Sequence, residues 1–170
     1  MQVPQLDEYA KKYENINFHR EDGILQVSMH TDNSDLVWGF GPHQELGYCF
    51  GDIGNDPENK VIIFTGSGDT FIHKEDLGGT GPDAKIWGEH VLPDAKRLLM
   101  NLLEIQAPMI AAINGPATVH AELGVLCDVS GRAALSQRAC TWRRRARRVA
   151  NANGIESRSV FLNDRARVVR

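Results

Sequence analysis

The sequence predicts an α/β fold with a mostly parallel sheet, on three observations. Residues 16–20 and 24–30 alternate between apolar and polar side chains, with the turn signal Asp22-Gly23 between them. Residues 61–65 and 109–113 are short, continuous apolar runs, which are typical of strands covered on both faces. A segment with helical spacing precedes each of these runs, so helices are expected to cross over between parallel strands.

The first elements follow from local signals. Residues 1–14 form a polar lead-in, with a short helix expected over residues 8–13. The Asp22-Gly23 pair predicts a hairpin turn between the two alternating segments. Residues 43–53 then carry apolar side chains at helical spacing, and this helix is expected to end near Gly54.

Two glycine-rich segments follow the strand over residues 61–65. Gly66-Ser67-Gly68 lacks the Lys-Ser/Thr of a phosphate-binding loop, so no nucleotide site is expected there. Residues 78–82 lead into a long helix that must end before Pro108, and Pro93 is compatible only with its start. The apolar face of this helix is predicted from residues at three- and four-residue spacing: Leu92, Ala95, Leu98, Leu99, Leu102 and Leu103.

The segment after residue 113 predicts a turn and a last helix. Gly115-Pro116 breaks the strand, and Thr118 is a suitable N-cap for a helix over residues 119–126. Such a helix leaves the backbone N–H of Val119 without an intrahelical acceptor, at the positive end of the dipole. This N–H and a second one from the loop over residues 65–77 can form an oxyanion hole. The alternative is a capped helix that only packs on the sheet.

The charge distribution divides the chain into two parts. The overall net charge of −3 hides a body up to Val129 with a net charge of −12 and a tail with a net charge of +9. All eleven basic residues of the tail are Arg, whereas six of the eight in the body are Lys. We therefore expect a domain over residues 15–129 and a separate Arg-rich tail, non-homologous or disordered, over residues 130–170.

Composition also bears on the compartment. The chain has no apolar run of the ~18 residues that a membrane span needs, and its acidic N-terminus is not a secretory signal, so a cytoplasmic protein without a membrane partner is expected. Cys49, Cys127 and Cys140 have no CxxC spacing, which indicates neither disulfides nor a metal site. Cys49 and Cys127 are expected to be buried as small hydrophobic residues.

Two segments together resemble the crotonase (enoyl-CoA hydratase/isomerase) superfamily. They are residues 111–115 followed by Glu122-Leu123 and Cys127-Asp128, and residues 61–77. The resemblance covers residues 15–129 and implies the N-terminal portion only of the ClpP/crotonase ββα-repeat fold, followed by an aberrant basic tail. It also implies catalytic roles for the backbone N–H groups of His73 and Val119 as oxyanion donors, and it puts Glu122 where hydratases of the family keep a glutamate.

Departures from the family pattern bear on the substrate. Residues 73–76 are His-Lys-Glu-Asp where CoA-thioester members have small residues, and residues 118–120 are Thr-Val-His where they have glycines. Residues 36–39, 43–50 and 58–61 resemble most the 6-oxocamphor hydrolase branch, which cleaves a C–C bond of a cyclic β-diketone without CoA. The substrate-binding residues expected on this basis are Trp38, Phe71 and Asp76.

The catalytic candidates are His73, Val119, His120 and Glu122. On a regular helix His120 and Glu122 point in different directions, so both are not expected to face one substrate. His73 or His120 can serve as the general base that this sequence otherwise lacks. Three functions stay open, namely hydrolysis of a β-diketone, hydration or isomerisation of an acyl-CoA, and an inactive truncated pseudoenzyme. A small-molecule substrate is expected and no cofactor, with CoA entering only as part of an acyl-CoA substrate.

The tail has two interpretations. Ser130-Gly131-Arg132-Ala133 replaces the apolar strand that follows Cys-Asp in the family, which a frameshift after about residue 129 explains together with the Arg excess. Alternatively, Arg143–Arg148 beside Trp142 form an arm that binds nucleic acid. We favour the frameshift and expect no nucleic-acid partner. Family members form trimers through C-terminal regions that have no match here, so no oligomeric state is predicted.

Overall fold

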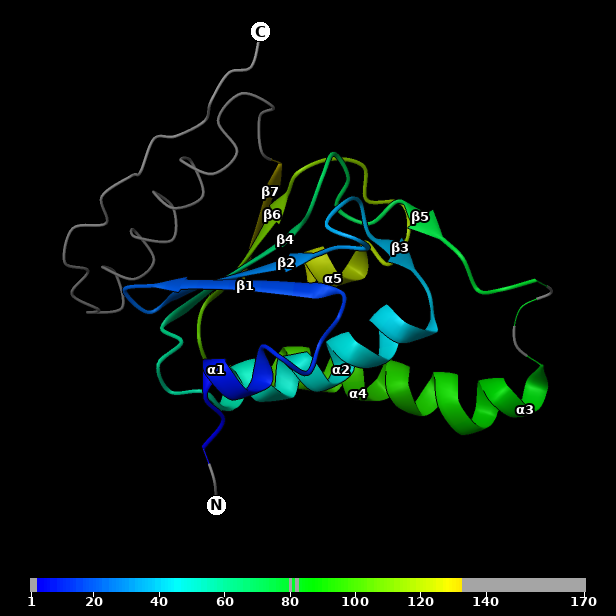
Figure 1. The fold of residues 1–170 in the computed structure, drawn as a ribbon, viewed down its shortest axis with the longest axis horizontal. Coiled ribbons are helices and arrows are strands. Elements are labelled where there is room, and N and C mark those ends of the chain that lie inside the picture. The colour runs from blue at the N-terminus through cyan, green and yellow to red at the C-terminus, as the bar shows by residue number, and fades with distance from the viewer. Residues whose placement is uncertain (1–2, 80, 82, 133–170) are drawn as a thin grey trace, which may run out of the picture.

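The computed structural model describes residues 3–79, 81 and 83–132, and it confirms the predicted α/β class (Figure 1). A five-stranded sheet has the order β1-β2-β4-β6-β7, in which only β1 and β2 are antiparallel. The strands are β1 (Ile16–Glu21), β2 (Ile24–Met29), β4 (Val61–Gly66), β6 (Met109–Ile113) and β7 (Val129–Arg132). The two remaining strands, β3 (Val37–Trp38) and β5 (Lys74–Glu75), form a separate parallel pair.

The predicted hairpin between β1 and β2 is confirmed. Asp22 and Gly23 both have positive φ, 52° and 77°, as a two-residue turn of this kind requires. The turn also contacts the start of β4, because the backbone N–H of Lys60 donates to the Gly23 carbonyl oxygen at 2.8 Å. The hairpin is thereby aligned with the first parallel strand.

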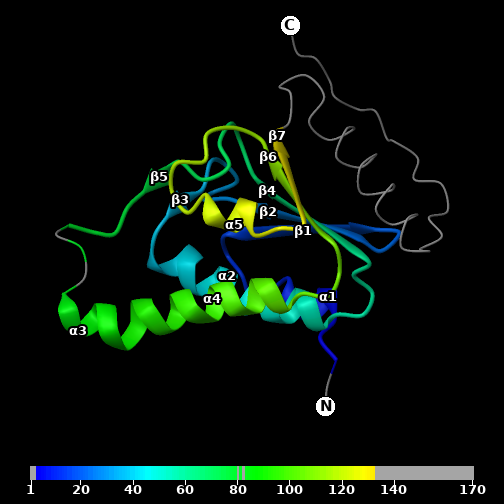
Figure 2. The same cartoon turned by 180° about the vertical axis from the view of Figure 1, so that it is seen from behind.

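Helices cover one face of the sheet. Figures 1 and 2 show α2 (Phe40–Asn55) and α4 (Leu92–Glu104) side by side beneath the strands. The two helices approach closely at Gly47, whose carbonyl oxygen accepts a hydrogen bond of 2.8 Å from Asn101 Nδ2. The core between helices and sheet is made of large buried side chains, among them Leu25, Val27, Leu46, Phe50, Phe64, Leu98 and Leu102.

The opposite face of the sheet carries a second, smaller apolar cluster of Ile24, Val61, Ile63, Ile110 and Ala112, against which Val129 packs. Strand β4 therefore buries apolar side chains on both faces, as its continuous apolar run predicts. Its central position between β2 and β6 is the physical reason.

The N-terminal segment differs from the expected polar lead-in. Helix α1 spans Leu6–Tyr9, earlier than predicted, and Tyr9 is completely buried. The Tyr9 hydroxyl donates to Asp56 Oδ2 at 2.9 Å, and Arg20 Nη1 donates to the same oxygen at 2.7 Å. Burial, partly offset by a hydrogen bond from Asn59, raises the pKa of Tyr9 above its ordinary value. This network joins the N-terminus to the end of α2.

The long helix is confirmed, with a change at its start. It begins as α3 (Ala84–Ile86), continues through a π-helical turn (Trp87–Val91) and becomes α4 at Leu92. Pro93 has no N–H to donate within the helix, and just before it the Leu92 N–H donates to the Trp87 carbonyl oxygen. The predicted apolar face is only partly correct: Leu98 and Leu102 are buried, whereas Leu92 and Leu103 are 59% and 58% exposed.

Other boundaries differ from the predicted ones by a few residues. Helix α2 begins at Phe40 rather than at residue 43. Strand β7 extends to Arg132, past the expected boundary at residue 129, in parallel register with β6. The rest of the tail, including both interpretations of its Arg residues, lies outside the described residues. Within the described residues, no helix is long and apolar enough to cross a bilayer.

The turn after β6 approaches the turn after β4 without room for a side chain. A Cβ on Gly115 would lie 1.8 Å from the Asp69 carbonyl oxygen. We therefore expect Gly115→Ala to force the two turns apart and to lower the free energy of unfolding by ~3 kcal/mol or more, as measured by urea denaturation.

The matched control is Gly88→Ala, because a Cβ on Gly88 meets nothing within 4 Å and the residue lies in a helical segment. This change is expected to leave the free energy of unfolding unchanged or to raise it by ~0.5–1 kcal/mol. Equal stability of the two variants would contradict the close approach of the turns.

Candidate functional site

The candidate site lies where the two parallel strands β4 and β6 end. The turns that follow them pair through their backbones: the Phe71 N–H donates to the Pro116 oxygen at 3.0 Å, and the Thr118 N–H donates to the Ile72 oxygen at 2.9 Å. We call this paired arrangement of residues 69–73 and 115–119 the loop pair. Ends of neighbouring parallel strands are a usual place for ligand sites in α/β proteins.

A buried asparagine fastens the base of the loop pair. Asn114 Oδ1 accepts a hydrogen bond of 3.2 Å from the Gly66 N–H, and Asn114 Nδ2 donates to the Gly68 oxygen at 3.2 Å. Both contacts connect the end of β6 with the end of β4. The side chain therefore holds the two strand ends at a fixed separation.

The predicted helix over residues 119–126 is wrong. Helix α5 spans only Glu122–Val125, and Thr118 is not its N-cap. The N–H groups of Thr118 and Val119 both donate to the Ile72 carbonyl oxygen, at 2.9 and 3.3 Å, so the chain pairs with the neighbouring loop instead of starting a helix. The Val119 N–H, expected to be a free oxyanion donor, is thus engaged within the protein.

His120 has a backbone conformation that side chains rarely adopt. Its φ is 47°, in the left-handed region, which costs a non-glycine residue roughly 1–2 kcal/mol. This conformation turns the chain between the loop pair and α5. Such strain persists only where surrounding contacts hold it, and it is concentrated at functional sites.

The turn at His120 brings together two candidates that were expected to diverge. His120 Nδ1 and Glu122 Oε1 are 2.6 Å apart. The expectation failed because His120 precedes α5 and does not have helical backbone angles. The two side chains form a hydrogen-bonded pair, and both remain partly exposed.

The indole ring of Trp38 lies against the imidazole ring of His120. The rings of Trp38 and His120 have their centroids 4.1 Å apart with an interplanar angle of 32°. His43 meets the same indole edge to face at 5.7 Å and lies 6.3 Å from His120. We call Trp38, His43, His120 and Glu122 the ring cluster; its members come from β3, α2, the turn before α5 and the start of α5.

His43 was not among the predicted site residues. In the sequence, His43 is only a histidine in the first turns of an amphipathic helix. It lies in the segment over residues 43–50 that resembles the 6-oxocamphor hydrolase branch, but the resemblance implies no role for it. It is 6% exposed, and burial, reinforced by His120, lowers the pKa of His43 despite an opposing effect of Asp94. His43 is therefore held neutral inside the ring cluster.

The other predicted residues lie outside the ring cluster. His73 is exposed, and its Nδ1 is 2.8 Å from Thr118 Oγ1. Phe71 is completely buried in the core, edge to face with Phe64 at 5.5 Å, so it does not line an open site. Asp76 supports Trp38 through its backbone, since its N–H donates to the Trp38 oxygen at 2.8 Å, but its side chain accepts from the Gly78 N–H.

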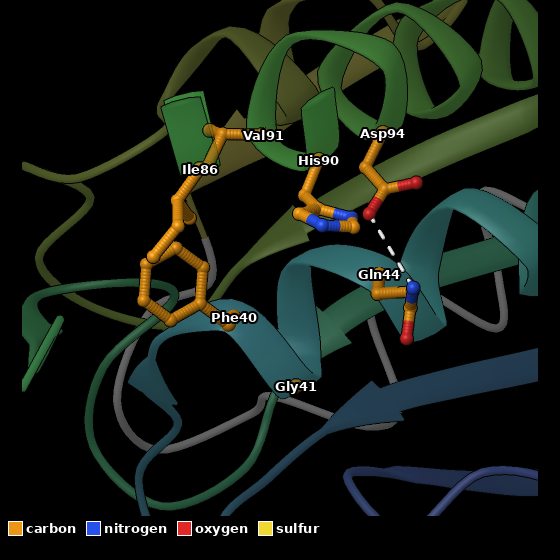
Figure 3. Close-up of a pocket in the computed structure, with 7 residues that line it drawn as sticks. All are labelled: Phe40, Gly41, Gln44, Ile86, His90, Val91 and Asp94. Atoms are coloured by element: carbon orange, nitrogen blue, oxygen red, sulfur yellow. Dashed lines mark hydrogen bonds between the residues drawn. The ribbon is translucent and has the colours of Figure 1, made fainter. Parts of the chain in front are cut away.

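A cavity of about 410 Å³ lies between the first turns of α2 and the helical segment over residues 86–94 (Figure 3). Its walls combine apolar and polar side chains, namely Phe40, Gly41, Gln44, Ile86, His90, Val91 and Asp94. Gln44 Nε2 donates weakly to Asp94 Oδ2 at 3.4 Å, and Arg97 pairs with the other oxygen of Asp94. Among the described residues that line the walls, the only carboxylate is that of Asp94, and Arg97 pairs with it.

The described residues contain no group of three or more His, Cys, Asp or Glu side chains arranged to hold a metal ion. Cys49 and Cys127 are free and buried, as expected, and burial raises the pKa of both thiols. Neither cysteine is therefore a candidate nucleophile.

Comparison with protein families identifies one match that covers most of the chain. A family model described as Enoyl-CoA hydratase/isomerase matches residues 20–139. Among curated proteins, a probable peroxisomal enoyl-CoA hydratase 1 from Arabidopsis thaliana is 34% identical over 86 residues, which are 50% of this chain and 31% of that protein. A carnitinyl-CoA dehydratase from Citrobacter koseri is 29% identical over 110 residues, 61% of this chain and 40% of that protein.

Solved structures show the same fold. The β-diketone hydrolase ABDH from the cyanobacterium Anabaena sp. PCC 7120, bound to (S)-3-oxocyclohexyl acetic acid, is 40% identical with a TM-score of 0.70, over 74% of this chain and 51% of that chain. An enoyl-CoA hydratase/isomerase from Mycobacterium paratuberculosis is 20% identical with a TM-score of 0.59, over 69% of this chain and 49% of that chain. This chain therefore spans about half the length of these structures, and less of the curated relatives.

The neutral state of buried His43 makes stability depend on pH. Below the ordinary histidine pKa of about 6.5 the unfolded chain binds a proton at this position more readily than the folded chain, in which the pKa of His43 is lowered. The free energy of unfolding is therefore expected to fall from pH 7 to pH 5. His43→Phe, which keeps a ring against Trp38, should reduce the slope of this decline in urea denaturation series. His19→Phe, at an exposed position on β1, is the matched control; equal slopes in both variants would exclude the assigned role of His43.

Proposed function

The chain belongs to the enoyl-CoA hydratase/isomerase family, also called the crotonase superfamily, and we propose from that premise that it hydrolyses a C–C bond of a cyclic β-diketone. The observation that carries the proposal is the ring cluster. Three aromatic rings and a carboxylate meet beside the loop pair, at the end of the sheet where ligands bind in such folds. We expect a small-molecule substrate and no cofactor.

His120 has the surroundings of a general base. Glu122 engages Nδ1, which fixes the ring orientation and favours the tautomer whose Nε2 carries the lone pair. In many hydrolases a histidine activates water through one ring nitrogen while a carboxylate binds the other ring nitrogen. Neutral His43 adds no positive charge beside it.

Trp38 supplies a donor. Its side chain is 2% exposed, and none of the hydrogen bonds found among the described residues uses its indole N–H. An indole N–H that no described residue engages can bind a carbonyl oxygen and stabilise the negative charge that develops on it. This role replaces the backbone donor at Val119, which is bonded to Ile72.

The proposed reaction uses these groups in sequence. His120 Nε2 takes a proton from water, and the resulting hydroxide forms a C–O bond to one carbonyl carbon. The tetrahedral adduct collapses, the C–C bond to the carbon between the carbonyls breaks, and its electron pair forms an enolate at the second carbonyl, near the Trp38 N–H. His120 returns its proton to the enolate carbon. The net reaction converts one diketone and one water molecule into one keto acid.

The β-diketone hydrolase ABDH supports this choice of substrate. It is 40% identical to this chain, and the ligand in its structure is an oxocyclohexyl acetic acid, which combines a ketone with a carboxylic acid. Hydrolytic opening of one ring in a bicyclic β-diketone yields a product of that class. We infer only the type of reaction from this relative, because this chain spans 51% of that hydrolase.

The second candidate is hydration or isomerisation of an acyl-CoA. The curated relatives favour it, since one is a probable enoyl-CoA hydratase and the other a carnitinyl-CoA dehydratase. Against it stand the engaged Val119 N–H and the histidine side chains at positions 73 and 120. The third alternative, an inactive protein, predicts no turnover of either substrate class.

The decisive measurement compares the full chain on a cyclic 1,3-diketone and on crotonyl-CoA. We expect hydrolysis of the diketone and none of the CoA ester. His120→Ala should lower kcat/KM for the diketone by ~100-fold or more, because it removes the general base. Glu122→Gln should lower it by about tenfold, because the ring loses a charged partner.

His19→Ala serves as the control for these variants, because His19 is an exposed histidine on β1 away from the ring cluster. Its rate should equal that of the unmodified chain. An unchanged rate in His120→Ala would refute the assignment, turnover of crotonyl-CoA alone would establish the second candidate, and no turnover of either would favour the third.

A further inference from the structure

The side chains of His73 and Thr118 close the open end of the loop pair. Their atoms Nδ1 and Oγ1 are 2.8 Å apart, although the residues are 45 positions apart in the sequence. The backbone pairing of the loops ends beside them, with Ile72 and Ala117 bridged and the Ile72 oxygen shared by two N–H groups. This side-chain contact adds to the backbone bonds that the Thr118 and Val119 N–H groups make to the Ile72 oxygen, just before the chain reaches His120.

His73 has no direct contact with the ring cluster. The ring contacts found among the described residues join His120 to Trp38 and His43, and none involves His73. One nitrogen of His73 is already engaged by Thr118. Its backbone leads into β5, which pairs with β3 beside Trp38, whereas its side chain is connected to His120 through Thr118 and Val119.

The strained turn at His120 needs support on both sides. On the C-terminal side, the hydrogen bond to Glu122 and the stacking on Trp38 hold the ring. On the N-terminal side, Thr118 is held by its N–H, which shares the Ile72 oxygen with Val119, and by its hydroxyl on His73. The side-chain contact is a further restraint on where the turn begins, in addition to the two backbone bonds to the Ile72 oxygen.

We propose that His73 is a positioning residue whose side chain forms a hydrogen bond with Thr118 and thereby holds His120 against Trp38. The catalytic consequence rests on the proposed function, in which His120 is the general base. The hydroxyl of Thr118 either donates to Nδ1 or accepts from it, so the contact forms with either ring tautomer. His73 acts through Thr118 and does not touch the substrate.

The first test reads the stacking directly, through the fluorescence of Trp38. In a background with Trp87→Phe and Trp142→Phe, Trp38 is the only remaining tryptophan, and a stacked imidazole quenches it. His73→Ala and Thr118→Val should each raise the Trp38 emission. The double variant should raise it no further than either single one, because both changes remove the same contact.

Rescue and controls separate positioning from general loss of structure. His73→Asn, whose amide can both donate and accept, should restore most of the quenching, while circular dichroism should show intact secondary structure in all variants. His19→Ala should leave the emission unchanged. Three results would each refute the positioning role of His73. They are unchanged emission in His73→Ala, additive effects in the double variant, and failure of His73→Asn to restore quenching.

The second test reads catalysis. On the cyclic 1,3-diketone, His73→Ala and Thr118→Val should each lower kcat by about five- to twentyfold with KM within twofold, and His73→Asn should recover most of the loss. A change in KM with kcat retained would overturn the positioning role. If the Trp38 emission rises without additivity in the double variant and neither the variants nor the parent chain hydrolyse the diketone, the positioning role of His73 is supported and the proposed function fails.

Discussion

The arrangement of the site depends on the close pairing of the two turns that follow β4 and β6. Backbone hydrogen bonds between residues 71–72 and 116–119 tie the turns together, and Gly115 permits an approach that a Cβ would block. Asn114 fixes the same spacing from inside, through the backbone of Gly66 and Gly68. Buried backbone groups must be paired somewhere, and here each loop supplies the partners of the other.

This pairing decides which chemistry is available. The N–H groups of Thr118 and Val119 both donate to the Ile72 oxygen, so the Val119 N–H is not free to serve as a backbone oxyanion donor. The chain then turns through the left-handed conformation of His120, which directs that ring onto Trp38 and brings Glu122 within hydrogen-bond distance. In the proposed function the family fold is thus retained while the groups assigned to the substrate are side chains rather than main chain.

The sequence predicts elements well where one local pattern decides them. The hairpin at Asp22-Gly23, the buried strand β4 and the long helix before Pro108 were all predicted, since alternation, a continuous apolar run and helical spacing are properties of the chain itself. Helix ends and exposed faces were predicted less well. Leu92 and Leu103 fit the helical spacing but are exposed, and spacing alone does not say how much of a helix face a neighbouring element covers.

The sequence by itself determined the α/β class, the mostly parallel sheet, the family and the candidate histidines. Only the tertiary structure decided that His120 and Glu122 meet, that His43 joins them and that Phe71 lies in the core. Thr118 satisfies every local rule for an N-cap, yet its N–H pairs with Ile72, 46 residues earlier in the chain. Competition between a local helix and a long-range partner is settled by the closeness of the two loops, which no local pattern encodes.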